Sequence, residues 1–171
     1  LRRGKTTCHK VFGEAQAILA GDALLTLGFE LLARNPSKLP APAVVRIIQR
    51  IAHAFGPKGM VAGQAIDIGQ VPSSPTPARL EDLERRKTGA LIQAALTAGA
   101  LVKGASASSL RALDLYGLKI GVAFQIADDL LDATSTTDQL GKEAGQDLKM
   151  KKTTFVTLYG VEGARNKANY L

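Results

Sequence analysis

The sequence predicts a single all-α domain, and three observations support that prediction. Apolar residues recur at three- and four-residue spacing through most of the chain, which is the period of an amphipathic helix. No stretch of useful length alternates apolar and polar residues, as a half-buried strand would. The 171 residues are 46% hydrophobic but only 5% aromatic, without Trp. A chain of this length and composition can bury a core of helices packed through Leu, Ala and Ile side chains.

The predicted helices succeed one another along the chain, separated by Gly- and Pro-containing breaks. Asn35-Pro36 and Gly56-Pro57 end two of them, because Pro cannot continue a helix. Ser106 or Ser108 can cap the helix that carries residues 121–132, an apolar stretch with three aspartates. Residues 71–77 are Pro-rich and predicted to be a loop, and the polar segment 134–152 is predicted to be a loop over the site. The predicted helices cover residues 11–34, 43–55, 59–69, 78–102, 106–133, 153–160 and 163–171.

Charge and composition narrow the classes of partner. The formal net charge is +7 and the pI about 9.7, which suits an anionic ligand, a nucleic acid or a membrane surface. Aromatic residues are not interleaved with the basic ones, so we expect no nucleic-acid partner. The longest uncharged run, residues 88–102, is too short to cross a bilayer, so we expect no integral membrane segment. The single cysteine, Cys8, excludes an internal disulfide and suits a reducing compartment.

Residues 121–132, GVAFQIADDLLD, are the stretch with the strongest chemical signal. On a helix, Gln125, Asp128 and Asp132 share one face, and Asp129 lies one position round from Asp128. One interpretation is a polar stripe that faces solvent. The other is a site for a hard cation, because carboxylates among apolar residues need compensating charge and oxygen-only ligands suit Mg²⁺. An Asp-rich helix of this kind indicates a diphosphate held through magnesium.

Two basic groups could bind the same ligand. The paired guanidiniums of Arg2 and Arg3 suit phosphate oxygens, although a solvated basic terminus is the better explanation of an isolated Arg pair. Lys87-Thr88 stands where a predicted helix changes from charged to apolar, and offers a point charge beside a hydroxyl donor. The alternative is a helix that enters the core while its last lysine extends to solvent.

DDLLD preceded by FQIA resembles the second aspartate-rich motif of the trans-isoprenyl diphosphate synthases, the head-to-tail prenyltransferases. The segment LRRGKTTCHKVFGEAQAILAGDALL is similar to the segment after the first such motif in that family, and KTG at residues 87–89 is similar to a third motif. Gly63-Gln64, with Asp67 soon after, resembles the family's GQ motif, for which we expect a role in packing and none in catalysis. The resemblance spans residues 1 to about 160.

The resemblance implies the fold of these synthases, a helical bundle around a central cavity, and a set of site residues. Asp128, Asp129 and Asp132 would bind Mg²⁺, and together with Lys87 would form the catalytic group. Arg3 would bind isopentenyl diphosphate. The match at Lys152 is imperfect, because Lys151-Lys152 and Thr153-Thr154-Phe155-Val156 replace the family's Gly-Lys and its threonine–aromatic–proline run. The residues expected to bind the allylic diphosphate are Arg2, Lys87, Thr88, Gln125, Lys142 and Lys152.

The implied reaction joins an allylic diphosphate to isopentenyl diphosphate with loss of pyrophosphate, as in farnesyl and geranylgeranyl diphosphate synthases. No DDxxD precedes Asp128, so the chain is expected to be one partial prenyltransferase domain, truncated at both ends and inactive alone. Two alternatives stay open: a non-catalytic subunit of a heteromeric synthase, and a class I terpene cyclase. The resemblance also implies a homodimer in the cytoplasm, or in a plastid if a transit peptide was removed.

Overall fold

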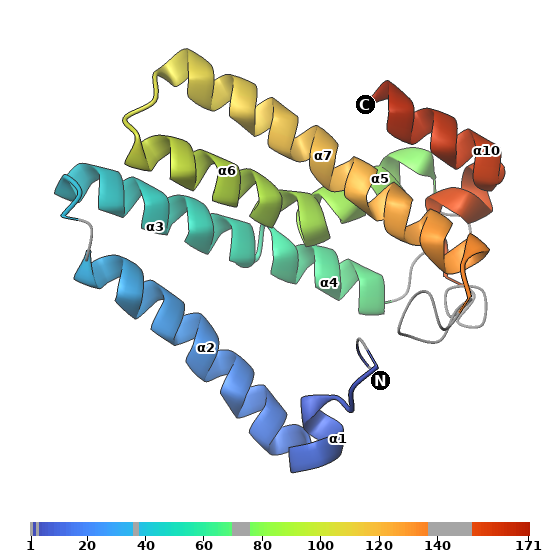
Figure 1. Cartoon of the computed structure of the whole chain (residues 1–171), viewed down its shortest axis with the longest axis horizontal. Coiled ribbons are helices and arrows are strands. Elements are labelled where there is room, and N and C mark those ends of the chain that lie inside the picture. Colours follow the sequence, from blue (N-terminus) through green and yellow to red (C-terminus); the bar gives the residue numbers. More distant parts are fainter. Residues whose placement is uncertain (1, 3, 36–37, 70–75, 137–151) are drawn as a thin grey trace.

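The structure is a computed structural model that describes residues 2, 4–35, 38–69, 76–136 and 152–171, and within them it is helical, without a named strand. The predicted fold class is confirmed. Helices α3, α6 and α7 lie side by side, α4 extends beyond α3, and α10 packs against the C-terminal part of α7 (Figure 1). The elements are α1 (Cys8–Phe12), α2 (Glu14–Arg34), α3 (Ala41–Phe55), α4 (Met60–Ile68), α5 (Pro77–Glu84), η1 (Arg85–Gly89), α6 (Ala90–Val102), α7 (Ala107–Thr134) and α10 (Phe155–Tyr170).

The helix ends are set by local sequence. Gly13, with φ of 88°, separates α1 from α2 inside the stretch predicted to be one helix. Asn35 ends α2 in the left-handed region, and its side chain bonds both the N–H and the carbonyl of Leu39 at 2.9 and 2.8 Å. The hydroxyl of Ser106 accepts the N–H of Ser109 at 3.1 Å, which caps α7 as predicted. Gly160, with φ of 69°, breaks α10 near the end of the first of the two short helices predicted there.

The predicted helix over residues 78–102 is interrupted. Residues Arg85–Gly89 form a π-helix, η1, in which hydrogen bonds span five residues instead of four. The sequence RRKTG carries no specific signal for this change, since Gly89 lowers the helix propensity without favouring a π-helical turn. Short π-helical turns occur often at functional sites, and this one contains Lys87 and Thr88.

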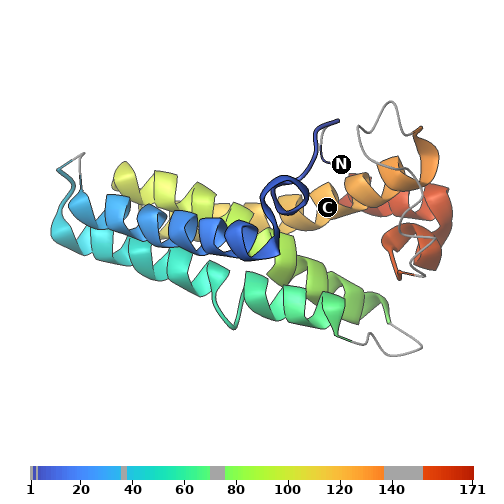
Figure 2. The same cartoon turned by 90° about the horizontal axis from the view of Figure 1, so that it is seen from below.

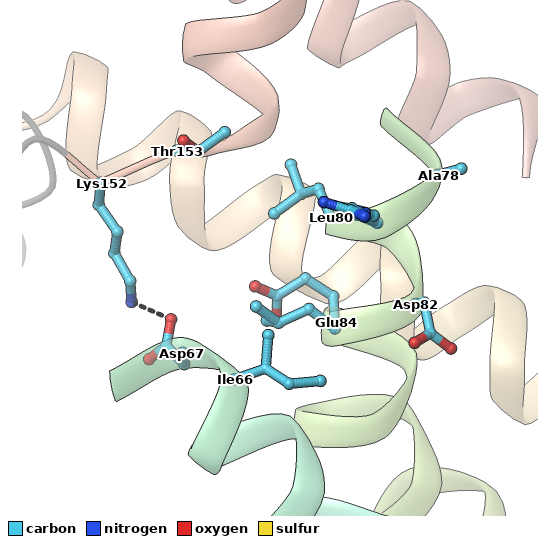
Figure 3. Close-up of a pocket in the computed structure, with 10 residues that line it drawn as sticks. Ile66, Asp67, Ala78, Leu80, Asp82, Glu84, Lys152 and Thr153 are labelled. Carbon is cyan, nitrogen blue, oxygen red and sulfur yellow. Dashed lines mark ion pairs between the residues drawn. The ribbon is translucent and has the colours of Figure 1, made fainter. Parts of the chain in front are cut away.

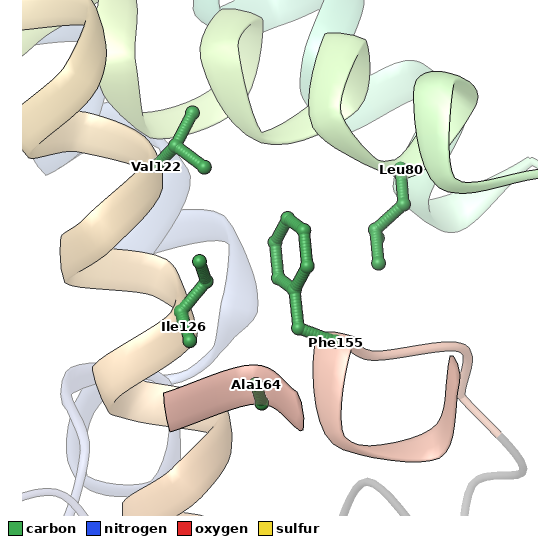
Figure 4. Close-up of a cluster of buried hydrophobic side chains, with 5 residues drawn as sticks. All are labelled: Leu80, Val122, Ile126, Phe155 and Ala164. Atoms are coloured by element: carbon green, nitrogen blue, oxygen red, sulfur yellow. The ribbon is translucent and has the colours of Figure 1, made fainter. Parts of the chain in front are cut away.

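The core has two apolar clusters at opposite ends of α7. One contains Leu80, Val122, Ile126, Phe155 and Ala164 from α5, α7 and α10, and Figure 4 shows the Phe155 ring between Leu80 and the α7 side chains. The other contains Ile47, Leu101 and Leu110 from α3, α6 and α7.

A polar contact joins α3 to α7 between these clusters. The Arg50 guanidinium donates to both carboxylate oxygens of Asp114, at 2.7 and 3.2 Å, and also to the buried Thr97 hydroxyl at 3.3 Å. A bidentate pair of this kind fixes orientation as well as distance. It therefore sets the rotation of α3 relative to α7.

Helix α2 differs from the other long helices because none of its residues is buried. It diverges from α3 in Figure 1, and Figure 2 shows it along the same layer as α3. By length and composition alone α2 is apolar enough to cross a membrane, with a mean hydropathy of 1.4 in its best window; it is the one such helix in the described part of the chain. One such helix near the N-terminus is weak evidence for a membrane span, since other kinds of apolar helix pass the same test.

We expect Gly121→Ala to destabilise the protein by about 1–3 kcal/mol, because the added methyl group would overlap the Cα atom of Gly89 where α7 crosses η1. Gly99→Ala is the matched control, since a Cβ atom at position 99 on α6 meets nothing within 4 Å. That change should be neutral or stabilising by up to about 1 kcal/mol. Urea denaturation followed by circular dichroism measures both, and equal effects of the two substitutions would contradict the steric explanation of the crossing.

Candidate functional site

Two lysines from distant parts of the chain converge on one carboxylate. Asp67, near the end of α4, pairs through Oδ2 with Lys87 Nζ at 2.6 Å and through Oδ1 with Lys152 Nζ at 3.0 Å. The second pair is drawn in Figure 3. Burial would raise the pKa of Asp67, but the hydrogen bonds and charges of the two lysines outweigh it and hold that pKa below its usual value. Asp67 therefore stays ionised and fixes two ammonium groups beside each other.

A close approach of two helices makes this contact possible. Gly63 lies on α4 against η1, and a Cβ atom there would lie only 2.6 Å from the Cα atom of Lys87. Asp67 comes four residues after Gly63, about one helical turn, and therefore shares its face of α4. Sequence reasoning gave the Gly63-Gln64-Asp67 motif a packing role only. The four-residue spacing was the signal that a carboxylate would face the same neighbour as Gly63.

The predicted pair Lys87-Thr88 lies in η1, beside Gln125 of α7. The Thr88 hydroxyl is 3.5 Å from Gln125 Oε1, a long hydrogen bond. Lys87 is partly buried, with a quarter of its side chain exposed, and its ammonium is held by Asp67. The alternative of a lysine that simply extends to solvent is therefore wrong.

The three aspartates of DDLLD do not form a stripe that faces solvent, which was the alternative to a cation site. Asp129 and Asp132 are each only 5% exposed, whereas Asp128 is half-buried. Asp129 accepts a hydrogen bond from Gln125 Nε2 at 3.1 Å and one from the backbone N–H of Phe155 at 2.8 Å. The second contact joins α7 to the start of α10.

Glu84 is a further buried acid, which sequence reasoning missed; it stands three residues before Lys87. Its side chain is 5% exposed, and Oε2 has no hydrogen-bond partner among the described residues. Burial, together with the charges of Asp129 and Asp67, raises its pKa to about 7, against the lowering effect of Lys87 and Lys152. Glu84 lines a cavity of about 510 Å³ together with Ile66, Leu80, Asp67 and Lys152. Figure 3 draws these side chains. The position of Glu84 at the last residue of α5 carried no sequence signal.

The carboxylates near the C-terminal end of α7 could bind a hard cation only if water or a bound ligand supplied further oxygen atoms. Within the described ranges no three His, Cys, Asp or Glu side chains gather closely enough to hold a metal ion alone. Asp128 and Asp132 nevertheless offer carboxylate oxygens on one face of α7. Mg²⁺ characteristically binds through one or two carboxylates and completes its shell with water and phosphate oxygens. The residues present therefore fit a magnesium ion that arrives with a phosphate ligand.

Three of the predicted site residues are not placed in this cluster. Arg3 and Lys142 lie outside the described residues. Arg2 is exposed, and its backbone pairs with Lys5 through hydrogen bonds of 2.8 and 3.1 Å. The residues that the structure does bring to one end of the bundle are Lys87, Thr88, Gln125, Asp128, Asp129, Asp132 and Lys152, with Asp67 and Glu84 beside them.

The described residues form an all-α bundle with two lysines paired to one carboxylate and two buried aspartates on a long helix. Comparison with known families identifies the class of protein. The polyprenyl synthetase family matches residues 1–171, and the chain belongs to that family.

The relatives and solved structures agree. The chain is 46% identical over 168 residues to the farnesyl diphosphate synthase of Geobacillus stearothermophilus, covering 98% of this chain and 57% of that protein. It is 43% identical to the geranylgeranyl diphosphate synthase of Cyanophora paradoxa over 171 residues, covering 99% of this chain and 57% of that protein. A geranyltransferase of Helicobacter pylori, solved with magnesium and isoprenyl diphosphate, matches with a TM-score of 0.88 at 36% identity, over 99% of this chain and 55% of that one. The chain thus spans little more than half the length of these proteins.

We expect Glu84→Gln to raise stability at pH 8 but not at pH 4. The folded protein raises the pKa of Glu84 from 4.5 to about 7, so its protonated form is favoured in the folded state. The free energy of unfolding is therefore highest below pH 4.5. It falls between pH 4.5 and about pH 7, by up to about 3 kcal/mol, as the folded protein loses the proton of Glu84. Glutamine cannot ionise and removes this loss.

Urea denaturation of both proteins between pH 4 and pH 8 tests the expectation. Glu162→Gln, a change at an exposed carboxylate of α10, serves as the control. Its stability should depend on pH as that of wild type does. Parallel profiles for wild type and Glu84→Gln would show that Glu84 does not titrate in this range.

Proposed function

We propose that this chain is the diphosphate-binding part of a trans-prenyltransferase that joins an allylic diphosphate to isopentenyl diphosphate and releases pyrophosphate. The observation that carries the proposal is the convergence of Lys87 and Lys152 on Asp67, next to Thr88 and Gln125. Two ammonium groups, a hydroxyl and an amide offer charge and hydrogen bonds to phosphate oxygens. Membership in the polyprenyl synthetase family and the names of the relatives support the same reaction.

The proposed roles depend on the charge that the reaction moves. When the allylic carbon–oxygen bond breaks, negative charge develops on the departing pyrophosphate while the carbon becomes an allylic cation. Lys87 and Lys152 would stabilise that pyrophosphate, because preorganised cations lower the energy of a developing anion. The double bond of isopentenyl diphosphate then attacks the cation, and a proton is lost. Arg2 and Lys142 would add contacts to the allylic diphosphate, and Arg3 would bind isopentenyl diphosphate.

Magnesium is the proposed cofactor, and when bound it would neutralise charge on the diphosphate. Asp128 and Asp132 offer the carboxylate oxygens for it, and Asp129 lies beside them in the same motif. The sequence contains this aspartate-rich motif once, so we propose that the 171 residues alone do not complete the reaction. Turnover by the isolated piece with geranyl and isopentenyl diphosphates would refute that statement.

Exposed leucines on α2 support the proposal of a homodimer. Leu24, Leu27 and Leu31 recur at helical spacing and are 69, 44 and 49% exposed. A contiguous apolar face of this kind on a helix with no buried residue is suited to packing against another protein surface. We propose that this surface is that of a second copy of the chain.

Loss of either lysine should weaken the binding of inorganic pyrophosphate in Mg²⁺. We expect Lys87→Gln and Lys152→Gln each to lower the affinity by about 10- to 100-fold, since a charge-assisted hydrogen bond is lost. Lys103→Gln, at the exposed end of α6, is the matched control and should stay within about twofold of wild type. Isothermal titration calorimetry gives the three affinities, and equal affinities for all variants would refute the site.

Leu24→Glu should dissociate the proposed dimer, because it places a charge in the apolar interface. Leu115→Glu on α7, at a position 58% exposed in the chain, is the control and should leave the assembly intact. Light scattering after size exclusion measures the mass of each protein. A monomeric wild-type protein, or a dimer that persists in Leu24→Glu, would contradict the assignment of α2.

A further inference from the structure

Asp129 is engaged by the protein on both of its carboxylate oxygens. Oδ1 accepts the Gln125 amide at 3.1 Å, and Oδ2 accepts the backbone N–H of Phe155 at 2.8 Å. The side chain is only 5% exposed, so both bonds form where competition from water is weak. These contacts tie together groups that stand on two different elements.

The first contact fixes the orientation of an amide. Because Gln125 donates through Nε2 to Asp129, its oxygen is directed to the other side, where the Thr88 hydroxyl lies 3.5 Å away. Asp129 thus sets which atom of Gln125 is presented toward η1. Without it the amide could rotate and present a donor where an acceptor now stands.

The second contact fixes the start of α10. Phe155 is the first residue of that helix, its side chain is fully buried, and Lys152 precedes it by three residues. The Thr154 hydroxyl caps the same helix by accepting the N–H of Thr157 at 3.1 Å. With the backbone of Phe155 held on α7, the chain can deliver the Lys152 ammonium to Asp67.

We infer that Asp129 is a positioning residue, which orients Gln125 and Thr88 and anchors the segment that carries Lys152, and that it is not a magnesium ligand. This inference rests on the proposed function, because those three residues matter as diphosphate contacts. It separates Asp129 from Asp128, its neighbour in the sequence. Asparagine at 129 keeps one oxygen as the acceptor for the Phe155 N–H and removes the carboxylate that a magnesium ligand needs. Its NH2 group then faces the Gln125 Nε2 donor, so the Gln125 amide has to rotate.

The test compares four forms of the full chain: wild type, Asp129→Asn, Asp129→Ala and Asp128→Asn. Pyrophosphate affinity is measured by calorimetry both in Mg²⁺ and in EDTA. We expect Asp129→Asn to bind about threefold more weakly than wild type, by the same factor in Mg²⁺ and in EDTA, because it loses the orientation of Gln125 and keeps the contact to Phe155. Asp129→Ala should bind about tenfold more weakly in both, because its effect acts through protein groups. Asp128→Asn should lose about tenfold in Mg²⁺ and nothing in EDTA.

Hydrogen exchange at the Phe155 amide gives an independent readout. It should be slow in wild type and Asp129→Asn and faster in Asp129→Ala, because that amide then has no acceptor. All measurements are made well below the melting temperature of each variant.

Each contrary outcome identifies what has failed. If Asp129→Asn loses affinity only in Mg²⁺, as Asp128→Asn does, Asp129 is a metal ligand and the inference is wrong while the proposed function stands. If Asp129→Ala melts earlier but binds pyrophosphate like wild type, its role is in stability alone and the inference is again wrong. If wild type binds no pyrophosphate in either condition, the proposed function fails and the inference fails with it.

Discussion

The close contact of helix backbones around η1 is the constraint on which the rest of the structure depends. Gly63 lets α4 approach Lys87, and Gly121 lets α7 approach Gly89, each at a distance that a side chain would prevent. As a result η1 lies between two helices that carry polar groups. Asp67 reaches Lys87 from one side, and Gln125 meets Thr88 on the other. The polar contacts of the site therefore depend on the close packing of these helices.

The group formed by Asp67, Lys87 and Lys152 carries one positive charge in excess. Two lysines face one ionised carboxylate, Asp67, while Glu84 has its pKa raised to about 7 and is largely neutral in mildly acidic solution. Two neighbouring ammonium groups would repel each other, and the carboxylate of Asp67 between them offsets that repulsion. An arriving anion then meets cations that are already in place, so little ordering remains to be done on binding.

Much of this arrangement was predictable from the sequence, for reasons that concern particular residues. The helical spacing and the breaks at Asn35 and Gly56 located α2 and α3, and the aspartates among apolar residues marked α7. Lys87, Thr88 and Gln125 were identified because their motifs are local. Asp67 and Glu84 were not: the spacing of Gly63 and Asp67 indicated only a shared helix face, and the lysine partners of Asp67 and the burial of Glu84 depend on long-range contacts. The bond from the Phe155 N–H to Asp129 belongs to the same class, since backbone donors are invisible in a sequence.

The π-helical turn has one more consequence, which concerns register. A turn with one extra residue advances the helix by about 100° relative to an uninterrupted α-helix. The two halves of one long rod, α5 and α6, can therefore present their apolar faces in different directions. Leu80 on α5 packs with the cluster at Phe155, whereas Leu101 on α6 packs with Ile47 and Leu110 at the far end of α7. Deleting a single residue from Arg85–Gly89 would force both halves into one phase, and one of the two clusters would lose its partner.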